Sequence, residues 1–251
     1  MVYRNPRYYE LAFSFRDIPR EVDLLEESAK RYARIPVKRF MDVGCGNAPH
    51  LEELARRGYH YTGIDTSEEM IEYARHKAGI LQLPTDLCHA SMVDFHLSRQ
   101  VDYAYVMLGS LYIASTEELN SHFDSMGRAI NSGGLYLLDW CVRYDPLSDS
   151  AQEWQMEDGG TRVDVTFSQT SVNLIEQTFE ETLELQVDDR GVKTVLIEQF
   201  VRRAIYPQEF LAFIRSRRDF EFVGWWNNWD LSRPLIGTEQ IDRPIAIVRR
   251  T

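Results

Sequence analysis

Apolar runs with the character of strands alternate with segments of helical periodicity through the first 141 residues. The pattern predicts buried strands at 39–43, 59–65, 87–92, 101–108 and 135–140, with helices between them at 49–58, 66–79 and 116–134. Such alternation is typical of a parallel sheet covered by helices on both faces and joined by right-handed crossovers. A further amphipathic helix is predicted ahead of the sheet, at 20–33.

The period changes after residue 145, where apolar and polar positions alternate one by one. Ile175, Phe179, Leu183, Leu185 and Val187 are predicted to face a core, and Glu176, Glu180, Glu184 and Asp188 to face solvent. Tight turns are predicted at 158–160 and 188–191, so the segment is an antiparallel meander with one wet face. A helix at 206–217 and closing strands at 220–229 and 244–250 follow.

These elements predict an α/β fold with a doubly wound, mostly parallel sheet of seven strands. An antiparallel β insertion is expected after the fifth strand, at residues 145–205. The chain has no internal repeat and no low-complexity linker, so residues 1–251 are predicted to form a single domain. The insertion would then be a cap or a subunit contact.

Acidic residues are concentrated in one segment of the chain. The net charge is −11, and residues 144–200 hold 13 acidic residues against 3 basic ones, whereas the remainder holds 26 against 25. A nucleic-acid-binding protein shows a large basic surface instead, which argues against DNA or RNA as a partner. The acidic segment coincides with the meander, where a solvated sheet face explains it; a preference for cationic substrates is the alternative.

Neither the start of the chain nor its interior predicts contact with a membrane. No apolar signal core is found near the start, and no stretch approaches the ~18 apolar residues of a spanning helix. Cys45, Cys88 and Cys141 are odd in number and scattered, which favours reduced thiols in the cytoplasm over a disulfide framework. No pair has metal-ligand spacing, so no metal is expected.

The stretch DVGCGNAPH, residues 42–50, follows a predicted strand and opens a predicted helix. Such a loop can be a tight turn without a ligand. It can also be a dinucleotide site, whose signature is G-x-G-x-x-G with an acid about 20 residues later. Asp65 supplies the acid, 21 residues after Gly44, but Pro49 stands where close helix packing calls for a third glycine.

Three longer blocks carry a wider pattern, and the first of them contains this loop. They are MDVGCGNAPHLEELARRGYHYTGIDTSEEMIEYARHK, HASMVDFHLSRQVDYAYVMLGSLYI and AINSGGLYLLDW. Their content and order resemble class I S-adenosylmethionine-dependent methyltransferases of the small-molecule type, a methyltransferase-domain family. The resemblance covers roughly residues 39–141 and, more weakly, 206–250. It implies a Rossmann-like fold that binds S-adenosylmethionine as methyl donor and releases S-adenosylhomocysteine.

The resemblance also implies which residues hold the methyl donor. Gly44 and Gly46 would let the backbone approach the methionine moiety, and Asp65 would accept both ribose hydroxyls. Residues after the third strand meet the adenine in the family; Ser91 stands where many relatives have an acid. The full set implied is Asp42, Gly44, Cys45, Gly46, Asp65, Thr66, Met70, Ser91, Met92 and Leu108.

Catalytic residues are harder to predict, because methyl transfer depends mainly on alignment and a general base is optional. The candidates are Tyr9, in an N-terminal segment that would fold over the donor, Tyr112 after the fourth strand, and Asp139 at the end of the fifth. His50 is expected to face solvent. His89 is expected to be a satisfied core histidine.

Two features near the C-terminal half bear on the substrate. Trp225, Trp226 and Trp229 form an aromatic cluster that core packing explains, with a cage for a cationic substrate as the alternative. The order of insertion, helix and strand pair resembles sugar-amine and glycine N-methyltransferases. This likeness of architecture suggests a small substrate without identifying it.

The sequence therefore predicts a cytoplasmic enzyme that transfers a methyl group from S-adenosylmethionine to a nitrogen or oxygen of a small molecule. The alternatives are a non-catalytic S-adenosylmethionine-binding or scaffold protein, a nucleotide-cofactor oxidoreductase, and an enzyme with a protein substrate. A homodimer through the acidic insertion is compatible with the pattern. Neither nucleic acid nor membrane is expected as a partner.

Overall fold

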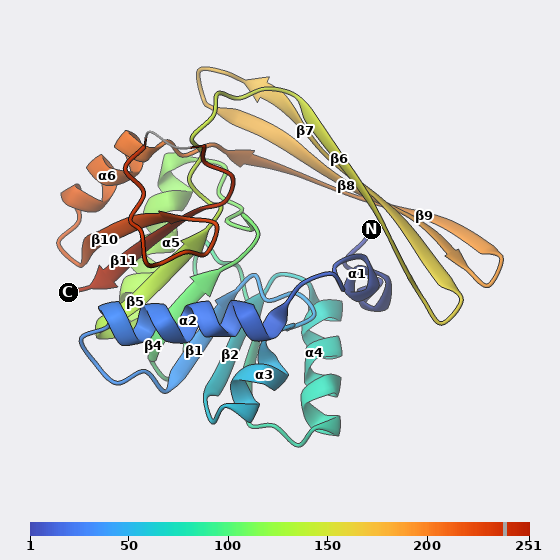
Figure 1. The fold of residues 1–251 in the computed structure, drawn as a ribbon, viewed down its shortest axis with the longest axis horizontal. Coiled ribbons are helices and arrows are strands. Elements are labelled where there is room, and N and C mark those ends of the chain that lie inside the picture. Colours follow the sequence, from blue (N-terminus) through green and yellow to red (C-terminus); the bar gives the residue numbers. More distant parts are fainter. Residues whose placement is uncertain (238–239) are drawn as a thin grey trace.

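A seven-stranded sheet lies beside a separate four-stranded sheet in the computed structural model, which describes residues 1–237 and 240–251 (Figure 1). The strand order of the larger sheet is β10-β11-β5-β4-β1-β2-β3. Its strands are β1 (Arg39–Val43), β2 (His60–Asp65), β3 (Thr85–His89), β4 (Val101–Val106), β5 (Ile130–Asp139), β10 (Phe220–Asn227) and β11 (Pro244–Arg250). The first five run parallel, and β11 pairs antiparallel with both β5 and β10. The predicted fold class is confirmed.

Helices cover both faces of this sheet. On one face lie α2 (Ile18–Tyr32), α3 (Leu51–Arg56) and α4 (Glu68–Ile80), and on the other α5 (Thr116–Ala129) and α6 (Pro207–Ser216). Alternate residues of each strand supply the two cores, so that Phe40 packs under α2 and α3 while Met41 packs with the α5 side. Ser67 caps α4 by accepting a hydrogen bond from the backbone N–H of Met70.

One predicted helix ends earlier than expected. The helix predicted at 116–134 stops at Ala129, and residues 130–134 already belong to β5. Gly133 has φ +86°, and a Cβ at Gly134 would lie 2.4 Å from the carbonyl oxygen of Asp102. The paired glycines therefore allow β5 to run close beside β4, a role that tertiary contact decides and local pattern does not.

The second sheet is an antiparallel meander of long strands. It consists of β6 (Ser150–Asp158), β7 (Thr161–Asn173), β8 (Thr178–Asp189) and β9 (Val192–Arg203). Four of the predicted core positions of β8 are buried, whereas Ile175 lies in the β7–β8 turn and is 90% exposed. Glu181 occupies an inward position of the same strand and is 4% exposed. One face is thus largely apolar, with a buried carboxylate.

Helix α1 (Pro6–Ala12) lies between α4 and the second sheet, as Figure 1 shows. Trp154 Nε1 donates to the carbonyl oxygen of Ala12 at 2.7 Å, and Tyr8 donates to Asp189 at 3.0 Å. On the other side, Lys77 Nζ lies 2.7 Å from Glu10 Oε1. The N-terminal segment therefore joins the two sheets. Within the described residues, none of the helices is long and apolar enough to cross a membrane.

Candidate functional site

The glycine loop connects β1 to α3 at the carboxyl edge of the parallel strands, where ligands bind in open α/β sheets. Gly44 and Gly46 both have positive φ, +71° and +50°, a conformation that other residues adopt only with strain. The backbone N–H groups of Gly44 and Cys45 donate to the carbonyl oxygen of Ile64. The loop is thereby tied to the end of β2.

Asp65 stands at the end of β2 and braces the loop from the other side. Its Oδ2 accepts from the N–H of Gly46 at 2.8 Å, and its Oδ1 accepts from the N–H of Ser67 at 2.8 Å. A carboxylate has about four acceptor positions, so each oxygen retains one for a ligand. Burial raises the pKa of Asp65, while these backbone hydrogen bonds oppose the rise.

Two side chains lie over the loop. A methyl group added at Gly46 would be 3.8 Å from Cε1 of Tyr9, and one added at Gly44 would be 3.3 Å from Cε of Met92. Tyr9 comes from α1, so the N-terminal segment approaches the loop as the sequence predicts. Burial raises the pKa of Tyr9, and it raises the pKa of Tyr112 to about 12, so both phenols are protonated at neutral pH.

Several residues predicted to bind the methyl donor have side chains that make other contacts or are exposed. The thiol of Cys45 packs against the sheet, where a Cβ at Gly63 would lie 2.8 Å from it, and burial raises its pKa. Met70 is fully buried in α4, and Thr66 is exposed with its carbonyl oxygen 2.9 Å from His89 Nε2. Ser91 is exposed, and its hydroxyl accepts from the N–H of Val93.

Asp139 is fully buried at the end of β5 and receives four hydrogen bonds. Oδ2 accepts from the N–H of Leu108 at 2.8 Å and from Arg243 at 2.6 Å. Oδ1 accepts from Arg243 at 2.8 Å and from Trp229 at 3.2 Å. Leu108, in the loop after β4, has φ +54°. The carboxylate therefore holds that loop in a strained conformation, and its predicted part in the chemistry stays a prediction.

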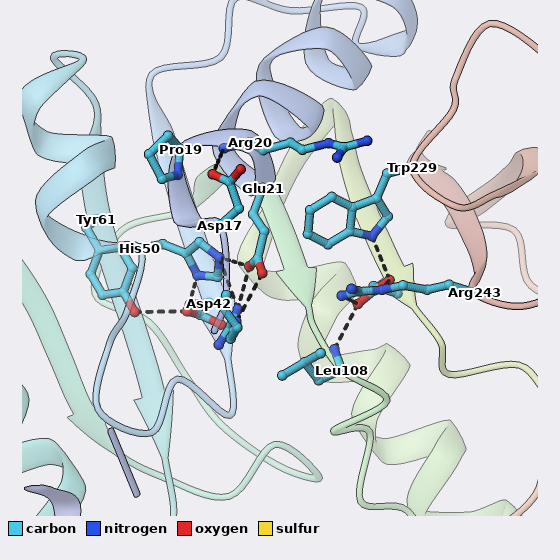
Figure 2. Close-up of polar contacts among 12 residues, drawn as sticks. Asp17, Pro19, Arg20, Glu21, Asp42, His50, Tyr61, Leu108, Trp229 and Arg243 are labelled. Carbon is cyan, nitrogen blue, oxygen red and sulfur yellow. Dashed lines mark hydrogen bonds and ion pairs between the residues drawn. The ribbon is translucent and has the colours of Figure 1, made fainter. Parts of the chain in front are cut away.

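A buried ionic cluster lies next to the glycine loop and contains His50. The expectation that His50 faces solvent was wrong. His50 is 1% exposed and does not face solvent. Figure 2 shows its ring between two carboxylates, with Nδ1 3.2 Å from Asp42 Oδ2 and Nε2 2.7 Å from Glu21 Oε2. Tyr61 also donates to Asp42, at 3.1 Å. Because α2 supplies Glu21, pairing across elements far apart in sequence buries this histidine.

The expectation that His89 is a core histidine was also wrong, because His89 is exposed at the end of β3. The buried neutral histidine is instead His122, whose Nδ1 lies 2.7 Å from the carbonyl oxygen of Met92. Burial lowers the pKa of His122 to about 4. Burial also opposes protonation of His50, but the carboxylates of Asp42 and Glu21, which accept hydrogen bonds from its ring, outweigh burial and raise the pKa of His50.

The two buried histidines are therefore expected to titrate on opposite sides of pH 6.5, His50 above it and His122 near 4, in NMR titrations of the imidazole carbons. Because the folded-state pKa of His50 is raised, its stabilising contribution is complete below pH 6.5 and lost as pH rises through the folded value. The difference in unfolding free energy between wild type and His50→Gln should accordingly shrink above pH 6.5. A difference that grows there would contradict the assignment.

A cavity of about 720 Å³ opens between the carboxyl edge of the larger sheet and the inner face of the smaller one. Aromatic rings make up much of its wall. They come from the N-terminal segment, the loop after β4 and the second sheet, and include Tyr3, Tyr9, Phe13, Tyr112, Trp154 and Phe200. Such a volume and lining suit a small organic molecule. The predicted residues Tyr9, Tyr112 and Leu108 all line it.

Three polar residues of this cavity were not predicted as site residues. Arg143, Glu181 and Arg202 line it, and Glu181 lies 3.3 Å from Arg202. The alternation in β8 already contained a signal, because Glu181 is the one charged residue at an inward position among Phe179, Leu183 and Leu185. A charge in an inward register is costly unless it is paired, which indicates a site.

The tryptophan cluster does not form a cage. Trp226 is 2% exposed and packs against Tyr32, whereas Trp225 packs against Phe222. Trp229 lies under Arg243, with the guanidinium carbon 4.1 Å from the ring centroid. The three rings thus have separate surroundings. In the part of the chain that the structure describes, His, Cys, Asp and Glu do not gather into a metal-binding group.

Comparisons with known proteins agree with this geometry. Residues 40–134 match the family model described as methyltransferase domain. A putative methyltransferase of Geobacillus is 29% identical over 116 residues, 46% of this chain and 47% of the relative. The dTDP-3-amino-3,4,6-trideoxy-alpha-D-glucopyranose N,N-dimethyltransferase of Streptomyces venezuelae is 31% identical over 102 residues, 40% of this chain and 41% of the relative. This chain therefore aligns with less than half the length of these curated relatives.

The likeness in structure extends over the whole chain. An S-adenosylmethionine-dependent methyltransferase from Clostridium acetobutylicum superposes with a TM-score of 0.77 at 15% identity, covering 97% of this chain and 96% of that one. The second sheet is therefore part of the shared fold. Residues 40–134 thus match the methyltransferase domain family, and the chain has the fold of S-adenosylmethionine-dependent methyltransferases.

Proposed function

We propose that this chain binds S-adenosylmethionine on the glycine loop and transfers its methyl group to a small molecule held in the 720 Å³ cavity. The observation that carries the proposal is the position of Tyr9. Tyr9 covers the glycine loop on one side and lines the cavity on the other. Donor and acceptor would thus meet at a wall of protonated tyrosines, with residues 1–251 acting as a single domain and 145–205 as its cap.

The residues at the loop suit the donor chemically. Gly44 and Gly46 leave room for close approach of a ligand to the backbone, and Asp65 has free acceptor positions for two ribose hydroxyls. Ser91 and Met92 follow β3 and would lie along the adenine. Asp42, Cys45, Thr66 and Met70 would act through the backbone and the packing that supports it. When bound, S-adenosylmethionine supplies a methyl group activated by a sulfonium.

The protein's own contribution would be alignment and exclusion of water. Tyr9 and Tyr112 would contact the reacting groups from two sides. Asp139 would act as a positioning residue, since it holds the backbone of Leu108 and is itself fully buried. The acceptor atom is proposed to be a nitrogen or an oxygen. The amino-sugar N,N-dimethyltransferase that is 31% identical over 102 residues supports the nitrogen.

S-adenosylhomocysteine is expected to raise the melting temperature, and NAD is not. A ligand that binds only the folded state stabilises it by about 2.7 kcal/mol at 100 times its Kd. Differential scanning fluorimetry with both ligands over the same concentration range gives the comparison. Stabilisation by NAD alone would favour the oxidoreductase alternative and reject the proposal.

A non-catalytic binding or scaffold protein is the second candidate, because no general base is obvious beside the donor loop. Methyl transfer from labelled S-adenosylmethionine to a panel of small amines and alcohols separates the two. Stabilisation by S-adenosylhomocysteine without transfer to any acceptor of the panel would favour the scaffold function.

The remaining parts of the proposal concern partners and location. We place a homodimer contact on the outer face of the second sheet, where Val195, Ile197 and Val201 are 44–60% exposed beside acidic β8 positions. Sedimentation that shows only monomers at high protein concentration would contradict it.

A cytoplasmic location stays a prediction that rests on the three free cysteines.

A further inference from the structure

Two arginines flank one ring on the floor of the cavity. The guanidinium carbon of Arg143 lies 5.5 Å from the centroid of Phe179, and that of Arg202 lies 5.2 Å from the same centroid. Phe179 and Arg202 are cross-strand partners in β8 and β9. Both guanidiniums are therefore held in place by the second sheet and its junction with β5, with 15% and 10% of their side chains exposed.

A chain of hydrogen bonds connects the two arginines. Arg143 donates to Gln169 at 3.0 Å, Gln169 donates to Glu181 at 2.8 Å, and Glu181 pairs with Arg202. Arg202 also donates to the carbonyl oxygen of Gly109, in the loop after β4. This hydrogen-bonded network fixes the positions of both guanidinium groups before any ligand binds.

The charges of this cluster do not cancel locally. Glu181 is the one buried carboxylate of the cluster, and it pairs with Arg202. Arg143 pairs with Asp145, whose side chain is 70% exposed. The remaining charged lining residues are Arg203, which pairs with Glu209, and the exposed acids Glu153 and Asp242. Water screens the exposed acids, so the positive charge on the floor dominates where the dielectric constant is low.

Donors are also left over at this place. Nε of Arg143, Nε of Arg202 and the hydroxyl of Tyr144 are buried and have no hydrogen-bond partner within residues 1–237 and 240–251. All three belong to side chains that line the cavity. Buried donors without acceptors are costly, so hydrogen bonding within this cluster is incomplete.

We infer that the acceptor molecule carries an oxyanion, such as a carboxylate, that binds between Arg143 and Arg202 while its apolar body contacts the aromatic wall. This inference rests on the proposed function and narrows its substrate class to anionic, partly aromatic or apolar small molecules. The oxyanion is the anchor. The guanidiniums neutralise its charge and so reduce its nucleophilicity, which leaves methylation to another atom of the molecule.

Three probes of similar size test the inference directly: indole-3-acetate is anionic, tryptophol neutral and tryptamine cationic. In calorimetric titrations of the protein saturated with S-adenosylhomocysteine, indole-3-acetate should bind about tenfold more tightly than tryptophol, as expected for charge-assisted hydrogen bonds. Tryptamine should bind most weakly. If tryptamine bound as tightly as indole-3-acetate or more tightly, the inference would be overturned. This comparison needs no variant.

The variant Arg143→Met should remove the preference for the anion, and Arg143→Lys should retain part of it. Arg162→Met is the matched control, because Arg162 lies on the second sheet, is exposed and pairs with Asp164, and neither residue lines the cavity. An anion preference unchanged in Arg143→Met would overturn the assignment of the site. S-adenosylhomocysteine binding is read separately, so its loss would count against the proposed function, whereas its retention without anion preference counts against the inference alone.

Discussion

Replacement of Asp65 by alanine is expected to weaken S-adenosylhomocysteine binding about 100-fold, because it removes a charged acceptor of two hydroxyl groups, each worth on the order of 1.5 kcal/mol. The substitution also removes the bonds from the N–H groups of Gly46 and Ser67, so the loop loses its brace. Calorimetric titration of the variant with S-adenosylhomocysteine measures the effect. Circular dichroism establishes that the variant is folded.

The matched control for Asp65 is Asp94→Ala, after β3. The side chain of Asp94 is 68% exposed and pairs with Arg128 on the surface. Its removal should leave the affinity for S-adenosylhomocysteine within about twofold of wild type, because the residue lies outside the loop. Equal affinities of Asp65→Ala and wild type would mean that the ribose contact has been assigned to the wrong residue.

Removal of the Glu21 carboxylate should have the largest effect on stability. Burial would raise the pKa of Glu21, but hydrogen bonds from His50 and Arg16 outweigh it and lower the pKa to about 2. Glu21→Ala leaves the largely buried guanidinium of Arg16 and the imidazole of His50 without this partner. Breaking a buried ion pair costs about 3–5 kcal/mol, that is about half the stability of many domains. Urea unfolding at pH 7 measures the loss.

Glu27→Ala, on the same helix, provides the control. Glu27 pairs with Arg31, and their side chains are 44% and 41% exposed. Because exposed pairs contribute about 0–1 kcal/mol, this variant should unfold close to wild type. Similar losses in the two variants would show that burial of the cluster does not decide its contribution.

The fold could be predicted from the sequence because hydrophobic periodicity indicates which residues face a core. The strand ending in Val43, the glycine loop and Asp65 all lie where alternation and motif spacing put them. These features depend on local geometry: a positive φ calls for glycine, and an acid after β2 is fixed by the strand itself. Helix α1 was not predicted as a helix, since only its tertiary contacts decide its conformation.

The polar parts of the site were beyond sequence reasoning, because residues distant in sequence form them. His50 has the local surroundings of an exposed helix start, and only α2 brings Glu21 to it. Arg143 and Arg202 come from segments about 60 residues apart and meet at the ring of Phe179. The charged residue at the inward position 181 was the one local sign. A residue that breaks a regular alternation therefore merits as much attention as a motif.

Helix α1 would be a common wall of the two proposed ligand sites. Tyr9 lies over the glycine loop, while Phe13 faces the cavity and packs against Trp154 of the second sheet. A ligand on either side must therefore meet a wall whose position the other ligand also influences. Thermodynamic linkage requires that the factor by which one ligand changes the affinity for the other is the same in both directions. The seven residues of α1 would thus couple the two binding equilibria to each other.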